Sequence, residues 1–265
     1  MSEVVQRSFN ATLSSLSAIT LEEMDSIKLM NRIDSKYLTD EAHLLAVLAD
    51  AANAGYRVLE TEGERLSPYT SVYYDTETLR MFCDHHNRRL VRQKVRTREY
   101  VNSGTAFLEI KRKNNKGRTN KKRIGIPNSE LLDFSEDKEA CEYLANKSWF
   151  HVDELSPVLD TRFSRITLVN PAKTERLTID THLCFHNYRT DKDATLYDAV
   201  IIELKQDGRA ESQMKHILLD HRIKPMRISK YCIAVTLTDP NARSGRFRPK
   251  VHKIEKTIHK KVSIQ

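Results

Sequence analysis

Residues 90–113 read LVRQKVRTREYVNSGTAFLEIKRK, and this stretch decides the fold class. Its two halves alternate between charged or polar and apolar residues, and Asn102-Ser103-Gly104 between them is typical of a turn. Successive residues of a strand point to opposite faces. One face of the first strand therefore carries a run of cations: Arg92, Lys94, Arg96 and Arg98. The stretch predicts a β-hairpin with one strongly cationic face.

The same separation of charged from aliphatic side chains recurs in five further segments. Their charged sets are Glu109, Lys111 and Lys113; Lys121 and Arg123; Arg176, Thr178 and Asp180; Glu203 and Lys205; and Arg32, Asp34 and Lys36. For a single strand, the ordinary interpretation is a face in contact with water. In these six strands the side-chain charges are mostly positive. This argues against that interpretation, because a solvated face normally mixes positive and negative charges. In a closed sheet the charged sets would line the inside and the aliphatic sets would pack outward on helices.

The rest of the chain fits an α+β fold, an antiparallel sheet or barrel with peripheral helices. Further strands are expected near residues 31–38, 69–75, 120–126, 158–169, 175–184 and 196–205. Thr20 and Glu23 form a capping-box pattern that opens one helix, Asp40 caps another that ends at Gly55, and helices are also expected near 77–86, 128–146, 209–220 and after Ser229. We expect an N-terminal helical segment over residues 1–28, the main domain over 29–240 and a flexible basic tail over 241–265.

Composition excludes several classes of protein. The 265 residues contain no apolar run of about 20, and the first thirty lack a signal-peptide pattern, so we expect a cytoplasmic protein without a membrane span. The four cysteines stand far apart and form no CxxC, which argues against a disulfide framework or a zinc cluster. The seven glycines form neither a GxG nor a P-loop motif. Any bound phosphate must therefore be held by side chains.

Positive charge is concentrated in residues 88–123, which hold fourteen Lys or Arg and two Glu. A sheet interior lined with so many like charges would be unstable when empty, because the cations repel one another and lose hydration. Replacing Lys36, Arg96, Arg98 or Lys111 by Ala should then leave the protein folded. A bound polyanion would balance the charge, and Lys and Arg side chains are common clamps on phosphoryl groups.

Seven segments of the sequence resemble, in order, those of the VTC domain. They are Asn31–Tyr37, Arg96–Tyr100, Leu108–Lys113, Lys121–Arg123, Arg176–Thr181, Ile202–Lys205 and Ser229–Tyr231. The VTC domain is the polyphosphate polymerase domain of the vacuolar transporter chaperone, within the triphosphate tunnel metalloenzyme (CYTH) superfamily. The resemblance runs from about Leu29 to Leu237. It implies an antiparallel tunnel barrel with helices packed outside, in which the γ-phosphate of ATP is transferred to a growing polyphosphate chain.

The resemblance also implies roles for individual residues. The catalytic positions that grip phosphates are Lys36, Arg96, Arg98, Lys111, Lys121, Arg165, Arg176 and Lys230. Substrate-binding positions are Arg32, Glu109, Lys113, Arg123, Lys205 and Ser229. The position of Glu203 is implied to hold a divalent metal ion, Mn²⁺ or Mg²⁺, and the implied partners are ATP and inorganic polyphosphate. Without the resemblance, Glu203 would be interpreted as an ion-pair partner of Lys205 or of an arginine across the barrel.

Two alternatives to a polymerase stay open. The first is a tripolyphosphate or nucleoside triphosphate hydrolase of the same fold. Many tunnel hydrolases carry ExExK on the first strand, whereas this chain has Arg32-Ile-Asp-Ser-Lys36, which favours the polymerase. The second is a module that binds polyphosphate or nucleic acid without chemistry. Nucleic acid is disfavoured because the basic faces lack interleaved Phe or Trp. Glu109 and Glu203 would repel a polyanion unless a metal intervenes, which favours an enzyme over a binding module.

Overall fold

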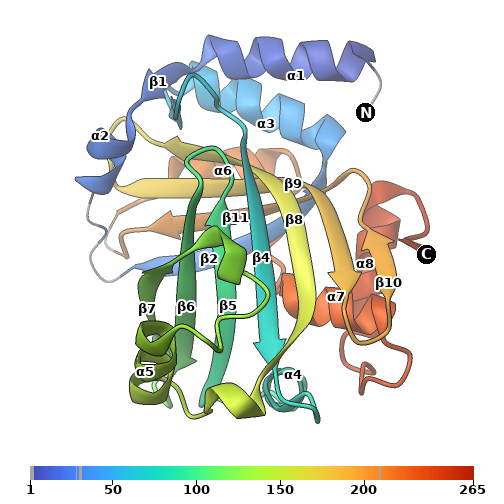
Figure 1. The fold of residues 1–265 in the computed structure, drawn as a ribbon. Coiled ribbons are helices and arrows are strands. Elements are labelled where there is room, and N and C mark those ends of the chain that lie inside the picture. Colours follow the sequence, from blue (N-terminus) through green and yellow to red (C-terminus); the bar gives the residue numbers. More distant parts are fainter. Residues whose placement is uncertain (1–2, 28, 30–31, 209) are drawn as a thin grey trace.

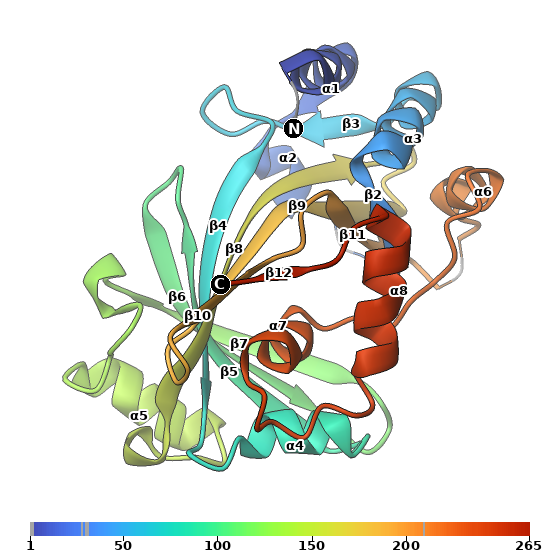
Figure 2. The same cartoon turned by 90° about the vertical axis from the view of Figure 1, so that its right-hand side faces the viewer.

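The computed structural model describes residues 3–27, 29, 32–208 and 210–265, so Asn31 and Arg209 of the predicted segments lie outside it. The strands are β1 (Ser17–Ile19), β2 (Ile33–Asp40), β3 (Arg57–Leu59), β4 (Ser67–Asp75), β5 (Arg92–Tyr100), β6 (Thr105–Lys113), β7 (Thr119–Ile126), β8 (Ser156–Val169), β9 (Glu175–Asn187), β10 (Lys192–Thr195), β11 (Ala199–Gln206) and β12 (Ser263–Ile264). The helices are α1 (Glu3–Ser15), α2 (Leu21–Asp25), α3 (Glu41–Asn53), α4 (Arg80–His86), α5 (Lys138–Lys147), α6 (Gln213–Asp220), α7 (Lys230–Thr238) and α8 (Arg248–Ile258). Figures 1 and 2 show a strongly curved sheet with helices on both sides.

The main sheet has the strand order β2-β11-β9-β8-β4-β5-β6-β7, and all of these neighbours are antiparallel. Within the described residues, no ladder joins the edge strands β2 and β7, so the sheet is not fully closed. An irregular segment lies beside β2 instead: Pro225 forms a bridge with Tyr37, and the Met226 amide donates to the Lys36 carbonyl at 2.7 Å. The predicted α+β fold with a tunnel-type antiparallel sheet is confirmed, with this opening along one side.

Helices cover the convex face of the sheet in two groups. Ile166, Leu177 and Ile202 belong to the core that α1, α3 and α6 complete. Leu108 and Ile110 belong to the core that includes Leu144 of α5. These aliphatic residues alternate along their strands with the charged sets, and burying each contributes about 1.5–3 kcal/mol. The period-two pattern therefore turns the charged sets toward the concave face.

Helix α7 packs on the concave side of the sheet (Figure 2), against buried apolar residues of β8 and β9. Five consecutive residues of this helix, Tyr231 to Val235, are buried, as expected for a helix surrounded by protein. The buried carboxylate of Asp75 accepts hydrogen bonds from the Tyr231 hydroxyl at 2.6 Å and from the backbone amides of Met81 and Phe82 at 2.8 and 2.9 Å. This junction ties α7 to α4 and places Lys230 beside the charged part of the sheet.

The C-terminal residues correct one prediction. Instead of a flexible tail, residues 248–258 form α8, and β12 pairs with β10. Phe247, Ile254 and Ile258 are buried in the same core as α7. Together with Val251 they follow the i, i+4, i+7, i+11 spacing of one helix face. The positive charge of this segment suggested disorder, although its apolar residues have this helical spacing. The prediction of a flexible tail is therefore wrong for these residues.

Helix starts follow the predicted capping residues. The Thr20 and Glu23 capping box is present at α2, and Asp40 caps α3 through the His43 amide at 2.8 Å. Helix α6 is capped by Ser212 and starts at Gln213, later than predicted. In the part of the chain that the structure describes, none of the helices has the length and apolarity to cross a membrane.

Candidate functional site on the concave face

The register of the sheet gathers charged side chains from seven strands on its concave face. Cross-strand partners point to the same side, and Lys36 pairs with Glu203, Arg96 with Glu109, and Arg165 with Asp180. Lys230 joins them from the start of α7. We call this set the charged face: Lys36, Lys94, Arg96, Arg98, Glu109, Lys111, Lys121, Arg165, Arg176, Asp180, Glu203, Lys205 and Lys230.

Glu109 is the most enclosed carboxylate of the charged face, with 0% of its surface exposed. It accepts from Arg96 Nε at 2.7 Å and from Lys121 Nζ at 2.8 Å. Burial opposes its ionisation, but Arg96, Arg98 and Lys121 hold the pKa of Glu109 well below its usual range. Arg96 also donates to the Tyr73 hydroxyl at 3.1 Å. The guanidinium of Arg96 is thus fixed from two sides.

Asp180 organises a second group of cations. Arg165 binds it with two hydrogen bonds, Nε to Oδ1 at 2.6 Å and Nη2 to Oδ2 at 2.9 Å, and Lys230 Nζ lies 2.6 Å from Oδ2. Although burial opposes ionisation, Arg165 and Lys230 hold the pKa of Asp180 well below its usual range. Phe163 stacks on Tyr69 beneath these cations, with Lys230 Nζ 2.9 Å and the Arg165 guanidinium 5.2 Å from the Phe163 ring centre. Cation–π attraction therefore supports both positive charges.

Glu203 is the carboxylate held least tightly. Its Oε2 atom lies 3.4 Å from Lys36 Nζ and 3.5 Å from Lys205 Nζ, and its side chain is 24% exposed. Burial raises the pKa of Glu203, but Lys205, Lys36 and Arg165 together lower it below its usual range. The ion-pair interpretation of Glu203 thus describes its contacts in the free protein.

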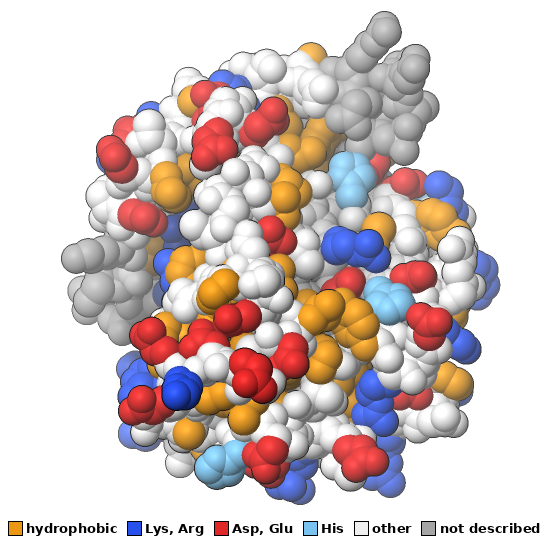
Figure 3. Space-filling model, in the orientation of Figure 1, with side chains coloured by type: hydrophobic (Ala, Val, Ile, Leu, Met, Phe, Trp, Pro, Cys, Tyr) orange, Lys and Arg blue, Asp and Glu red, His pale blue; other side chains and the backbone are white. Residues whose placement is uncertain are grey.

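Three cations of the charged face have weak or absent compensation. Arg98 donates to the Ser71 hydroxyl at 2.8 Å, and burial with Arg96 and Arg165 nearby lowers its pKa to about 10. The neighbouring Arg96, followed by burial, lowers the pKa of Lys111 well below its usual value. Burial lowers the pKa of Lys205 to about 8. The charged face holds ten Lys or Arg side chains against three carboxylates, so positive charge is in excess. By contrast, the surface in Figure 3 shows acidic and basic side chains interspersed, with acids gathered over α5.

Four predicted residues lie at the rim of the charged face or at the start of α7. Arg32 is exposed and binds Asp34, with Nε 2.6 Å from Oδ1. Arg123 lies on the edge strand β7, 4.3 Å from the Phe107 ring centre. Lys113 is close to Arg92 and Arg227. Burial is the main cause that lowers the pKa of Lys113, and these two arginines lower it further. Ser229 caps α7 by accepting from the Cys232 amide, and it accepts from Lys94 Nζ at 3.0 Å.

Sequence reasoning assigned no role to Asp180, Lys94, Tyr69 or Phe163. The alternation of β5 and β9 already placed Lys94 and Asp180 on charged sets. What it could not supply was the partner of Asp180, because Arg165 lies beyond a register shift between Arg162 and Ser164. Aromatic residues in strands indicate a core, so nothing marked Tyr69 and Phe163 as supports for cations.

On the charged face, Glu203 is the carboxylate that is best placed to bind a metal ion. Across the described ranges, no three His, Cys, Asp or Glu side chains converge to hold a metal by themselves. Glu109 and Asp180 are each bound by two cations. Glu203 is partly exposed and has longer contacts. It fits a metal whose remaining ligands are phosphate oxygens and water, a ligand set typical of Mg²⁺.

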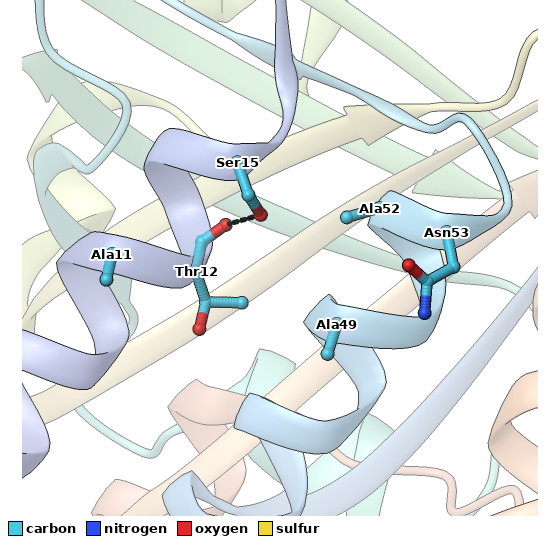
Figure 4. A pocket seen from close by; sticks show the side chains of 6 residues that line it. All are labelled: Ala11, Thr12, Ser15, Ala49, Ala52 and Asn53. Carbon is cyan, nitrogen blue, oxygen red and sulfur yellow. Dashed lines mark hydrogen bonds between the residues drawn. The ribbon is translucent and has the colours of Figure 1, made fainter.

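A pocket elsewhere in the structure is lined by small and uncharged side chains. It lies between α1 and α3 and is lined by Ala11, Thr12, Ser15, Ala49, Ala52 and Asn53 (Figure 4). The hydrogen bond drawn there, from the Ser15 hydroxyl to the Thr12 carbonyl at 2.7 Å, lies within α1. No charged side chain lines this pocket, so the charged face is the stronger candidate site.

Comparisons with known proteins address the family and the fold. The VTC domain family matches residues 31–238. No curated protein matches the sequence. Among solved structures, HpAC1 from Hippeastrum, described as a candidate adenylyl cyclase with a dominant triphosphatase activity, aligns with a TM-score of 0.48 and 15% identity over 76% of this chain and 94% of its own. A conserved hypothetical protein from Pyrococcus furiosus aligns with a TM-score of 0.42 and 12% identity over 76% of this chain and 99% of its own.

Proposed function

This chain belongs to the VTC domain family, and we propose that it is a polyphosphate polymerase that transfers the γ-phosphate of ATP to a growing polyphosphate chain on the charged face. Family membership supports the broader activity, phosphoryl transfer on triphosphate or polyphosphate substrates. The excess of cations over carboxylates supports the same substrate class, because it leaves a net charge for a polyanion to neutralise. Strand β2 supports the direction of the reaction that we propose.

The observation that carries the polymerase direction is the ion pair between Arg32 and Asp34. Many tunnel hydrolases have two glutamates at these positions of the first strand. Here Arg32 replaces the first acid, and it binds Asp34 through Nε at 2.6 Å and Nη2 at 3.1 Å. This edge of the site therefore lacks the carboxylate pair that would help a metal to activate water. Transfer to a phosphate acceptor needs mainly positioning and charge neutralisation.

The charged face divides these two tasks between its residues. Arg96 and Arg165 are fixed by Glu109 and Asp180, so they offer guanidinium groups that need little reorganisation. Arg98, Lys111 and Lys205 have the least compensation and bind phosphate oxygens in exchange for lost hydration. Helix α7 and the Tyr69–Phe163 stack place apolar surface beside Lys230 and Arg165, and we expect this surface to limit the access of water.

Glu203 is the residue we assign to a divalent cation, Mn²⁺ or Mg²⁺. Such an ion, when bound, neutralises negative charge on the phosphates as the terminal group is transferred. Lys36 and Lys205, which hold Glu203 in the free protein, are then available to phosphate oxygens.

The proposal is tested by incubating the purified protein with ATP and Mn²⁺ and staining a gel for polyphosphate. Lys111→Ala removes a cation of the charged face and should lower synthesis at least about a hundredfold. Arg112→Ala is the matched control, because Arg112 is the next residue of β6 and lies over Trp149 at 4.8 Å. Its activity should equal that of the wild type. Phosphate release without polymer would indicate the hydrolase, and binding without ADP formation would indicate a non-catalytic module.

A further inference from the structure

A second group of cations lies at the start of β5, and we call it the outer cation cluster: Arg92, Lys113, Arg227 and Lys250. Arg92 and Lys113 are cross-strand partners, so their side chains share the concave side of the sheet. Arg227 belongs to the segment before α7, and Lys250 belongs to α8. Lys250 Nζ donates to the Arg227 carbonyl at 2.6 Å, which joins these two segments. Ser229, two residues after Arg227, accepts a hydrogen bond from Lys94, two residues after Arg92, so this pair lies next to the β5–β6 hairpin.

The outer cation cluster differs from the charged face in its lack of acids. Among the described residues, no ion pair connects any of its four members to a carboxylate, whereas Glu109, Asp180 and Glu203 each pair with two cations of the charged face. His85 lies among them with Nδ1 3.0 Å from Cys232 Sγ. Burial, together with Lys94, Arg92 and Lys250, lowers the pKa of His85 to about 2, so it is neutral. The repulsion between the cations is therefore uncompensated in the free protein.

The outer cation cluster is continuous with the charged face. Arg92, Lys94 and Arg96 follow one another on the same side of β5, at steps of about 7 Å. Lys94 Nζ reaches Ser229 Oγ at 3.0 Å, at the N-terminus of α7. A row of positive charge therefore runs from Arg96 out to Arg227 and Lys250. Lys250 lies beyond residues 31–238, which match the VTC domain family, so α8 adds this charge from outside the matched region.

We propose that the outer cation cluster binds the part of an inorganic polyphosphate chain that extends beyond the charged face. This inference rests on the proposed function and assigns Arg227 and Lys250 to chain-length preference. A linear polymer with one charge or more per unit matches a row of cations without acids. Single-stranded nucleic acid fits less well, because its binding sites commonly offer exposed aromatic side chains for base stacking. Phe247, the ring beside Lys250, is only 4% exposed.

The test compares a short and a long polyanion on the double variant Arg227→Gln/Lys250→Gln. Glutamine keeps a hydrogen-bond donor and removes the charge. Binding of tripolyphosphate, which needs only the charged face, should stay within about twofold of the wild type, while binding of a chain of about 100 phosphates should weaken about tenfold at low salt. Lys256→Gln is the matched control on α8, because its exposed side chain lies outside the cluster, and it should bind both anions like the wild type.

Each other outcome overturns the inference. If the double variant binds the long chain as tightly as the wild type does, the outer cation cluster has no role in binding, while the proposed function stands. If wild-type protein binds neither anion, the proposed function falls and this inference falls with it. If a single-stranded oligonucleotide of equal phosphate count binds as tightly as polyphosphate and loses as much affinity in the variant, the cluster binds nucleic acid instead.

Discussion

Arg96 and Arg98 lie close together on β5, but Glu109 gives them different effects on the stability of the fold. Arg96 neutralises a carboxylate that is fully buried, whereas Arg98 has a hydroxyl as its partner and lies among like charges. Breaking a buried ion pair from one side costs about 3–5 kcal/mol, because the remaining charge stays buried. Removing Arg98 instead relieves repulsion. The sequence-based expectation that alanine at either position leaves the fold intact is therefore revised for Arg96.

We predict that Arg96→Ala lowers the free energy of unfolding by about 3 kcal/mol or more, while Arg98→Ala leaves it unchanged or raises it. Urea denaturation of the two variants and the wild type, without added phosphate, measures this difference. Adding Glu109→Gln to Arg96→Ala should restore part of the loss. Equal midpoints for the two single variants would show that Glu109 does not depend on Arg96.

Glu203 offers a separate test of the metal assignment. Glu203→Gln keeps the size of the side chain and removes its charge, so turnover should fall at least about tenfold and lose its dependence on Mn²⁺ concentration. Binding of tripolyphosphate without metal should be retained or strengthened, because Lys36 and Lys205 lose their acidic partner. Wild-type turnover with unchanged metal dependence would leave Glu203 as an ion-pair partner only.

Lys205 should make ligand binding depend on pH. Burial lowers its pKa from 10.5 to about 8 in the free protein. Below about pH 8 it is charged in both folded and unfolded chains and destabilises the fold, and this cost is relieved as the pH rises from about 8 to 10.5. A bound polyanion favours the charged amine and raises the pKa again. Binding near pH 8.5 should therefore take up protons and weaken as the pH rises further.

Calorimetry of tripolyphosphate binding at pH 8.5, in buffers with different ionisation enthalpies, measures the number of protons taken up. The wild type should show uptake, and Lys205→Arg should show less, because an arginine stays charged throughout this range. The same proton uptake in both proteins would mean that Lys205 does not change its protonation on binding.

At the scale of elements, α8 is the longest element that the sequence analysis did not predict. Its apolar residues have helical spacing, but eight Lys or Arg after Pro240 suggested a disordered segment. The eight strands of the main sheet were predictable, because a period of two depends only on which face is buried. The partners of Glu109, Asp180 and Glu203 were not, because they depend on the register between strands distant in sequence.

Truncation after Pro240 should therefore destabilise the protein and not merely weaken its affinity for long chains. It removes Phe247, Ile254 and Ile258, which are buried with α7, and each contributes about 1.5–3 kcal/mol. The unfolding midpoint in urea should fall by an amount that corresponds to about 5 kcal/mol, and apolar surface on α7 should become accessible to a hydrophobic dye. An unchanged midpoint would mean that α8 does not complete the core.

At the scale of the whole molecule, curvature turns six separate charged faces into one site. The sequence pattern assigned side chains to faces, and the resemblance ordered the motifs, but neither could show that the sheet stays open between β2 and β7. At that opening the segment around Pro225 and Met226, which has no periodic pattern, lies beside β2 and contacts it. The fold class and the side of the sheet on which the charged residues lie were thus predictable, and the pairing of those residues with one another was not.

The central claim is that the γ-phosphate of ATP passes to another phosphate and not to water. The most direct measurement follows this phosphate by ³¹P NMR during turnover of the wild-type protein with ATP and Mn²⁺. We predict that each ADP formed is matched by one new phosphate inside a polyphosphate chain, with little free phosphate. Equal amounts of ADP and free phosphate, without a polyphosphate signal, would contradict the account and identify a hydrolase.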